Sequence, residues 1–359
     1  MSLDDLVQLL TKEAVIYTYR PDALRRSPAD VEQRYRVHAG THVPLGDTER
    51  YVDTIIRWVG GANRGAFIGA VIGDYGQGKT SFLVHVWASC AERQVLAVPP
   101  FTLEPEGIRS TSAIIERIMD AVDAWVQYRL KDSHPAHAVR AAQVYEQFRA
   151  RTIDEAAGRI ARERGLPYEQ VLALLASGEV HARTEVSVKD LYDYLEALSH
   201  VVEETGAYRG LLVLLDEPEV AAKNLGTNEV AGFLFDIADT AGQREGNYGF
   251  FLAIAANFYA TAETSFSSLT ARLQRCGCRV VLDNLYGADF ARALWERYCE
   301  RLAITEHSDR IVLPLTLEAI GQLGSSARRD LGEGPRTVVS AFARMVARFR
   351  EENVPYHPA

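Results

Sequence analysis

The residues with the clearest chemical potential lie in one glycine-rich segment. Residues 73–80 fit the pattern Gly-x-x-x-x-Gly-Lys-Ser/Thr at every fixed position. A triphosphate needs many hydrogen-bond donors close together, and backbone N–H groups supply them only where no side chain intervenes, which glycine allows. We therefore expect a phosphate-binding loop that consists of Gly73, Asp74, Tyr75, Gly76, Gln77, Gly78, Lys79, Thr80 and Ser81.

The flanking sequence gives this loop the context that it needs. Residues 67–72 form an apolar run of the length of one buried strand, and residues 81–90 can form a mostly apolar helix. The N-terminus of a helix carries free N–H groups and a dipole that favour an anion. We expect Lys79 to reach the β- and γ-phosphates of ATP and the Thr80 hydroxyl to bind Mg²⁺.

Two acids form a second signature. Residues 211–215 are five apolar residues followed directly by Asp216 and Glu217. The carboxyl ends of parallel strands face the ligand crevice, so Asp216 is expected beside the Mg²⁺ held by Thr80. Glu217 is then placed to orient and polarise an attacking water. The alternative is that the two acids only cap the turn at Pro218.

A third strand, residues 250–256, ends at Asn257, whose amide could bond the γ-phosphate or the water. The alternative for Asn257 is an ordinary turn-forming residue. A helix at 267–274 and a strand at 279–282 follow, with Arg272 and Arg275 near the end of that helix. Taken singly, each arginine is a surface residue.

Composition sets bounds on the protein class. The chain has 359 residues, a net charge of −9 and 47% hydrophobic residues, which is typical of a globular protein of two or three domains. The charge argues against a surface that coats nucleic acid everywhere but leaves room for a local basic face. We see no basic n-region at the N-terminus and no apolar run near ~18 residues, so we expect a cytoplasmic protein without membrane contact. Scattered cysteines without zinc-ligand spacing favour free thiols.

The residues before the glycine loop are expected to form a leader that mixes helical and extended segments. Residues 3–16 suggest a helix, and the prolines at 21 and 28 suggest breaks. Residues 34–44 suggest an extended segment before the next helix. Asp47 is a candidate N-cap for a helix at 48–59 that ends at Gly60 and Gly61.

The segments between the two signatures are mostly helical. Residues 95–98 suggest a strand that stops at two prolines, and helical patterns follow at 114–125, 136–164 and 168–176. Ser187 and Asp190 resemble a capping box for a helix that ends at Gly206. The mixed Arg/Glu charges favour a solvated face over a partner-binding one.

The fold class that these elements predict is α/β, a P-loop NTPase with a parallel sheet between layers of helices. We divide the chain into a leader (1–45), an ATPase core (46–286) with a helical insertion at about 105–185, and a C-terminal helical lid (287–359). The lid has a basic balance and places Arg336 at a helix start after Gly334 and Pro335.

The order of these motifs resembles that of AAA+ ATPases, and residues 269–275 and 280–286 resemble the origin-recognition-like branch. The loop with Asp74 and Tyr75 and the long insertion are also similar to the ATP-binding proteins of BREX-type phage-defence systems. The AAA+ resemblance covers about 46–350. It implies that Asn257 is a sensor-1 residue, that Arg336 is a sensor-2 residue, and that Arg272, or alternatively Arg275, is an arginine finger. A finger acts on a neighbouring subunit, so the resemblance also implies a homo-oligomer.

These features favour an ATP-hydrolysing motor or switch that acts on DNA or a DNA-bound partner, in phage defence with other defence-system proteins. The alternative is a signalling or scaffold NTPase with slow hydrolysis and a protein partner. A small-molecule kinase is less favoured because Glu217 suits water activation. A GTPase is less favoured because no Asn-Lys-x-Asp element occurs.

Overall fold

The computed structural model describes residues 18–40, 42–44, 47–62, 65–103, 106, 108–177 and 186–282, together with the single positions 290, 293, 296 and 297. The helix expected at 3–16 lies outside the described residues. So do Arg336 and nearly all of the expected lid.

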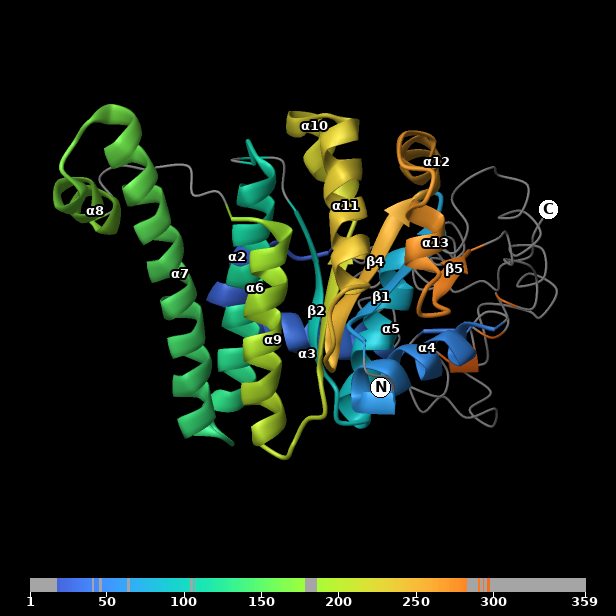
Figure 1. Ribbon diagram of the computed structural model, residues 1–359. Coiled ribbons are helices and arrows are strands. Elements are labelled where there is room, and N and C mark those ends of the chain that lie inside the picture. The colour runs from blue at the N-terminus through green and yellow to red at the C-terminus, as the bar shows by residue number, and fades with distance from the viewer. Residues whose placement is uncertain are drawn as a thin grey trace, which may run out of the picture.

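A five-stranded parallel sheet forms the centre of the described chain (Figure 1). Its strand order is β2-β3-β4-β1-β5, and every neighbouring pair is parallel. The strands are β1 (Phe67–Gly73), β2 (Leu96–Thr102), β3 (Leu211–Asp216), β4 (Tyr248–Ala255) and β5 (Arg279–Val281). Parallel order brings the carboxyl ends of β1, β3 and β4 to one edge of the sheet, where the predicted loop and acids lie.

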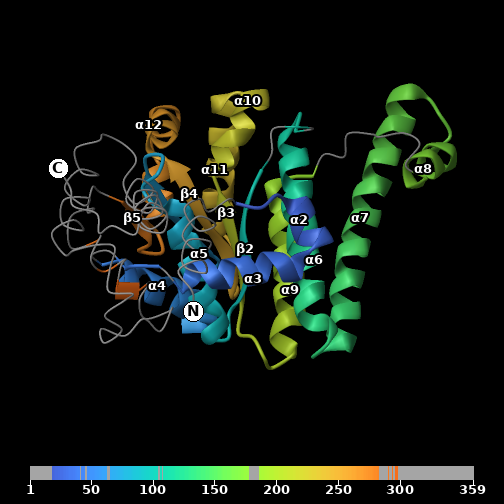
Figure 2. The ribbon, with the colours of Figure 1, turned by 180° about the vertical axis from the view of Figure 1, so that it is seen from behind.

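Helices cover both faces of this sheet. The described helices are α2 (Pro21–Arg26), α3 (Pro28–Ala39), α4 (Thr48–Arg57), α5 (Lys79–Glu92), α6 (Thr111–Lys131), α7 (Pro135–Arg164), α8 (Tyr168–Ala176), α9 (Val188–Glu204), α10 (Ala222–Leu225), α11 (Thr227–Ala241), α12 (Ala256–Ser265) and α13 (Leu269–Leu273), with short turns at Trp58–Ala62 and Pro218–Ala221. Figure 1 looks onto the side of α9 and α11, and Figure 2 onto the side of α3 and α5.

The core follows from the continuous apolar runs of the strands, because a strand covered on both faces has no polar side. Successive residues of β4 point to opposite layers. The ring of Phe250 packs against Tyr192 of α9, with centroids 5.7 Å apart, and the ring of Phe251 packs against Phe82 of α5 at 5.8 Å. All four side chains are buried.

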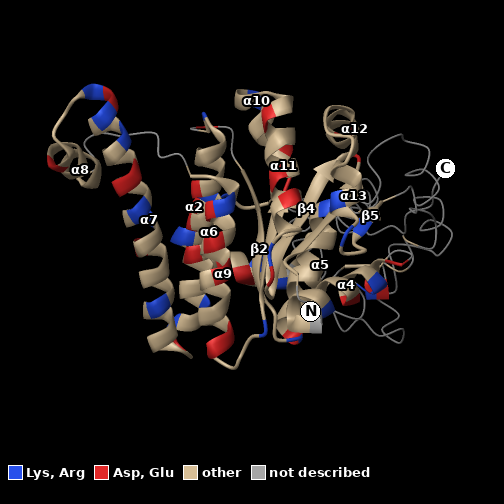
Figure 3. Cartoon of the chain, in the orientation of Figure 1, with Lys and Arg blue, Asp and Glu red and all other residues tan. Residues whose placement is uncertain are grey.

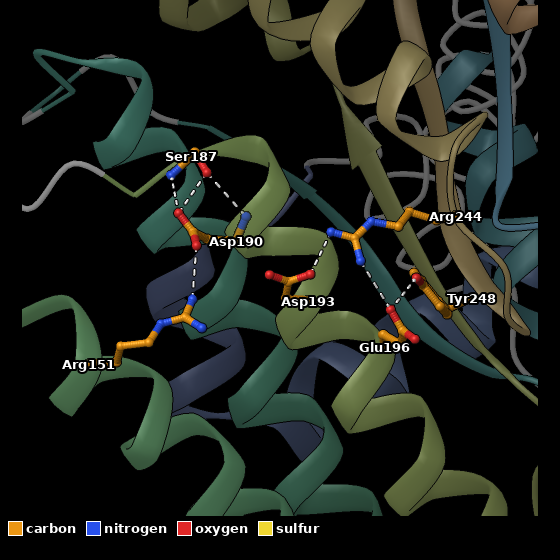
Figure 4. Close-up of polar contacts among 7 residues, drawn as sticks. All are labelled: Arg151, Ser187, Asp190, Asp193, Glu196, Arg244 and Tyr248. Atoms are coloured by element: carbon orange, nitrogen blue, oxygen red, sulfur yellow. Dashed lines mark hydrogen bonds and ion pairs between the residues drawn. The ribbon is translucent and has the colours of Figure 1, made fainter.

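Helices α6 to α9 lie on the β2 side of the molecule, with α7 outside α6 and α9 and with α8 farthest from the sheet, at the end of α7 (Figures 1 and 2). Polar contacts join α7 to α9 and α9 to β4 (Figure 4). Arg151 of α7 pairs with Asp190 at 2.8 Å, and Arg244 pairs with Asp193 at 2.5 Å. None of the helices in the described part of the chain has the length and apolar character that crossing a lipid bilayer requires.

Most local predictions are confirmed. The strands expected at 67–72 and 211–215 and the helices expected at 81–90 and 168–176 are present. The capping box is also present, because Ser187 and Asp190 exchange side-chain and backbone hydrogen bonds. The helix expected at 48–59 is present as α4. The Trp58–Ala62 turn follows it, and Gly61 in that turn has a φ of 95°. Asp47, however, makes no side-chain cap.

Two predictions are wrong, whereas the breaks expected at Pro21 and Pro28 are present, because Arg20 and Ser27 lie outside the helices. Residues 34–39 are not extended, because they belong to α3, which starts at Pro28. Pro21 and Pro28 each begin a helix, where the missing N–H costs nothing. The second strand does not stop at Pro99 and Pro100 but continues to Thr102. It lies at the edge of the sheet and shifts register between Val98 and Phe101, and both features accommodate proline.

Candidate active site

The glycine loop connects β1 to α5 with a backbone that glycine makes possible. Gly76 and Gly78 have φ angles of 82° and 86°, in the left-handed region that other residues rarely adopt. The backbone N–H of Asp74 donates to Oε1 of Gln77 at 2.7 Å, which fixes the shape of the loop from within. A Cβ at Gly73 would lie 2.7 Å from that same oxygen, so a side chain there would displace Gln77.

Lys79 is buried at the start of α5, with 5% of its surface exposed. Its Nζ donates to the carbonyl oxygens of Gly73 at 3.0 Å and Asp74 at 3.1 Å. A buried ammonium needs such partners. These carbonyls hold the charge over the loop, beside the free N–H groups of the α5 N-terminus. Tyr75, also in the predicted loop, is 63% exposed. Ser81 is partly buried, and its Oγ lies 3.1 Å from Nδ1 of His42.

Asp216 and Thr80 meet as the sequence predicts. The hydroxyl of Thr80 in α5 donates to Oδ2 of Asp216 at the end of β3, at 2.7 Å. Asp216 is fully buried, and burial raises the pKa of its carboxyl to about 6. Its other oxygen, Oδ1, is buried and accepts no hydrogen bond from the described residues. A carboxylate and a hydroxyl are hard oxygen ligands, so this pair fits a magnesium ion, which would satisfy the unpaired oxygen.

Glu217 follows in an unusual backbone conformation. Its φ of 47° lies in the left-handed region, and its N–H donates to the carbonyl oxygen of Ala253 in β4 at 3.0 Å. A non-glycine residue held there is strained, and such strain is typical of functional positions. The chain thus turns away from the strand direction directly after Asp216, with the Glu217 side chain only partly buried.

Asn257 lies at the end of β4, in the first turn of α12 rather than in the strand. Its side chain is exposed, and its Oδ1 accepts from the N–H of Phe258 at 2.8 Å. The amide is therefore near the same sheet edge as the acids but bonded to its own helix in this structure.

The two candidate finger arginines contact their own chain. Arg272 donates from Nε to Oδ1 of Asp239 at 2.7 Å, bonds the Ser268 hydroxyl, and lies over the Phe235 ring at 4.3 Å. Arg275 packs against the backbone of Gly242, at the end of α11. A role in a neighbouring site requires Arg272 to leave Asp239.

Two residues at this edge were not predicted. Glu219 is largely buried, and its Oε1 accepts from the N–H of Ala255 at 2.8 Å. Burial raises the pKa of Glu219 to about 7. Its place only two residues after Glu217 in the same turn is a signal that could have found it. Thr18 donates to Oδ2 of Asp216 at 2.5 Å from 198 positions away, and no local pattern indicates such a contact.

The sheet order, the glycine loop after β1 and the acid at the end of β3 define a P-loop NTPase fold. No protein-family model matches the chain, and no curated protein matches it. Among solved structures, the chain is similar to Cdc6p from Pyrobaculum aerophilum, with 14% identity and a TM-score of 0.45, over 88% of this chain and 65% of that one.

The chain is also similar to two proteins of Aeropyrum pernix. One is the ORC1 protein in complex with DNA, with 12% identity, a TM-score of 0.46, and coverage of 88% of this chain and 63% of that one. The other is the ORC2 protein, with 14% identity, a TM-score of 0.41, and coverage of 85% and 61%. The chain spans less than two thirds of the length of these structures. The fold assignment accordingly rests on the sheet order and the loop geometry above.

Proposed function

We propose that this protein is a magnesium-dependent ATPase of the AAA+ type. The observation that carries the proposal is the 2.7 Å hydrogen bond between Thr80 and Asp216. It joins a complete phosphate-binding loop to an acid-tipped strand and leaves one buried carboxylate oxygen without a partner among the described residues. Buried polar atoms are normally paired, so the unpaired Oδ1 supports a ligand at this position.

The chemistry follows from the residues in place. The loop N–H groups and Lys79 would bind the β- and γ-phosphates, and Thr80 and Asp216 would hold Mg²⁺, which would neutralise developing phosphate charge. Glu217 accepts a proton from water as the water oxygen bonds to the γ-phosphorus. The bond from that phosphorus to the β–γ bridging oxygen breaks, and ADP leaves with the electron pair. Asn257 and Arg336 are proposed to contact the γ-phosphate or the water.

The same proposal includes assembly. Arg272 is the proposed arginine finger on a neighbouring subunit's nucleotide, so the active form is a homo-oligomer. We place its action on DNA or on a DNA-bound partner, in phage defence alongside other defence-system proteins.

A second candidate is a nucleotide switch with a protein partner, and the charge pattern of α6 to α9 favours it. Figure 3 shows acidic and basic residues interleaved over these helices rather than a basic stripe. Several of these arginines already pair with acids, such as Arg140 with Glu204 and Arg151 with Asp190.

Binding of a fluorescent ATP analogue to wild type and to Lys79→Ala tests the core of the proposal. We expect Mg²⁺-dependent binding by wild type and its loss in the variant. Phosphate release with and without duplex DNA, at low and physiological salt, then separates the two candidates. Stimulation that shrinks with salt favours phosphate contacts and DNA. Slow turnover that DNA leaves unchanged favours the switch. Wild type that binds no ATP analogue contradicts both.

A further inference from the structure

The segment around Thr18 is fixed on the edge of the sheet that carries the candidate active site. Tyr19 forms a parallel β-bridge to Phe101 of β2, and the N–H of Thr102 donates to the Tyr19 carbonyl at 3.0 Å. Residues 18–20 thus continue the sheet by a short stretch beyond its edge strand.

A buried tyrosine anchors this stretch. The fully buried Tyr35 of α3 accepts from the N–H of Tyr19 at 3.2 Å and donates to the carbonyl of Pro100 at 2.8 Å. The rings of Tyr19 and Tyr35 meet edge to face, with centroids 5.4 Å apart. The position of residue 18 is therefore set by the contacts of Tyr19 with β2 and α3.

The Thr18 hydroxyl reaches the acid at the end of β3. Thr102, the last residue of β2, pairs with Asp216, the last residue of β3. The stretch around Thr18 bonds Thr102 through the Tyr19 carbonyl, so it lies along the same carboxyl-terminal part of β2. There the Thr18 hydroxyl donates to Oδ2 of Asp216 at 2.5 Å.

Two hydroxyls now share one carboxylate oxygen. Thr18 and Thr80 both donate to Oδ2, while Oδ1 is buried and has no protein donor in the described chain. Two donors on one oxygen fix the rotation of the carboxylate and turn the other oxygen toward the position where a cation would satisfy it. A hydrogen bond to a metal-binding group orients that group and adjusts its affinity.

We infer that Thr18 is a positioning residue for Asp216, which orients this carboxylate for the magnesium ion bound with ATP. The inference rests on the proposed function. It adds a contribution from a segment that precedes the glycine loop by more than fifty residues in the sequence. The same segment leads directly into α2, so the nucleotide site is linked to the layer of α2 and α6 through one hydroxyl.

The test compares Thr18→Val with Thr18→Ser, because valine keeps the shape and removes the hydroxyl, whereas serine keeps it. The readout is the Mg²⁺ concentration at half-maximal binding of a fluorescent, non-hydrolysable ATP analogue. We expect Thr18→Val to raise this midpoint by about 10-fold, in the range typical of losing a partner of a metal ligand, and Thr18→Ser to stay within about 2-fold of wild type. Analogue binding without Mg²⁺ and the thermal midpoint should change little.

Thr102→Val is a matched control, because Oγ1 of Thr102 is buried beside this stretch and makes no hydrogen bond with the described residues. It should leave the Mg²⁺ midpoint unchanged. An unchanged midpoint in Thr18→Val, or an equal rise in Thr102→Val, overturns the role of Thr18 while the ATPase proposal stands. Wild type that binds the analogue without any Mg²⁺ dependence overturns both.

Discussion

At the scale of single residues, the site depends on carboxylates that are buried to different extents. Asp216 carries two hydroxyl donors, whereas Glu219 accepts on Oε1 from the N–H of Ala255 and has a buried Oε2 without a partner among the described residues. Glu219 lies at the N-terminal end of α12, where a negative charge is favoured, yet burial dominates and raises its pKa to about 7. The neutral form is therefore favoured in the folded state over much of the acid range.

Glu219→Gln is expected to stabilise the protein at pH 8. The folded pKa is raised from 4.5 to about 7, so the folded state binds more protons than the unfolded state between these values, and stability falls as pH rises through them. Glutamine copies the neutral acid and can still accept from Ala255. The free energy of unfolding at pH 8 should rise by about 1 to 3 kcal/mol, with little change at pH 4.

Urea unfolding at pH 4, 6 and 8 measures this effect, with Glu163→Gln on the exposed side of α7 as the control. A variant that is no more stable than wild type at pH 8 would show that the Glu219 carboxylate is not penalised by burial.

The sequence was sufficient for residues whose role is local. The spacing of the glycines with Lys79 and Thr80 and the position of Asp216 after an apolar run predict the contact between loop and strand. Thr18 could not be predicted, because its bond to Asp216 depends on how a remote segment docks on β2. The contacts of Arg272 with Asp239 and Phe235 likewise could not be predicted, because they are tertiary contacts between α13 and α11.

At the scale of elements, close approach of β1 and β4 sets the geometry of the loop and of the acids. Gly249 pairs with Phe67, and a Cβ at Gly249 would lie 2.0 Å from the carbonyl oxygen of Phe67. Such a contact with backbone cannot be relieved by a side-chain rotation. In contrast, a Cβ at Gly158 of α7 would meet no atom within 4 Å.

We therefore predict opposite results for two Gly→Ala substitutions. Gly249→Ala should destabilise the protein by about 3 kcal/mol or more, or prevent folding, because the strands must separate. Gly158→Ala should stabilise it by about 0.5 to 1 kcal/mol through helix propensity. Thermal unfolding of both proteins checks the pair. Equal behaviour of the two variants would contradict the described packing of β1 on β4.

Element prediction succeeded where the pattern was periodic and failed at residues 34–39 and at the end of β2. The apolar runs of β1 and β3 and the stripe of α9 are unambiguous. The breaks expected at Pro21 and Pro28 are present, but each proline also begins a helix, and the pattern of residues 34–39 did not indicate that the second helix continues to Ala39. The run of β2 through Pro99 and Pro100 is possible only because β2 is an edge strand, and strand order is a property of the whole fold.

At the scale of the whole molecule, the proposed assembly requires Arg272 to exchange partners. It must leave Asp239 and Ser268 and reach the nucleotide of a neighbour. We expect Arg272→Ala to bind ATP but lose turnover, and a mixture of Arg272→Ala with Glu217→Gln to recover part of the activity. In the mixture, one protein supplies the base and the other supplies the arginine.

Phosphate release by each variant alone and by mixtures in several ratios measures this complementation. A mixture as inactive as its components, together with a lowered thermal midpoint for Arg272→Ala, would assign Arg272 to its contacts with Asp239 and not to a shared site.

Glu217→Gln tests whether the proposed site hydrolyses ATP. The amide cannot accept a proton from water, whereas the loop, Thr80 and Asp216 remain intact. The measurement is single-turnover phosphate release with Mg²⁺, beside ATP binding, for wild type and the variant. We expect equal binding and a loss of release by about 100-fold or more in the variant, the scale of lost acid–base catalysis. Release by Glu217→Gln at the wild-type rate, or no release by wild type, would contradict the proposal.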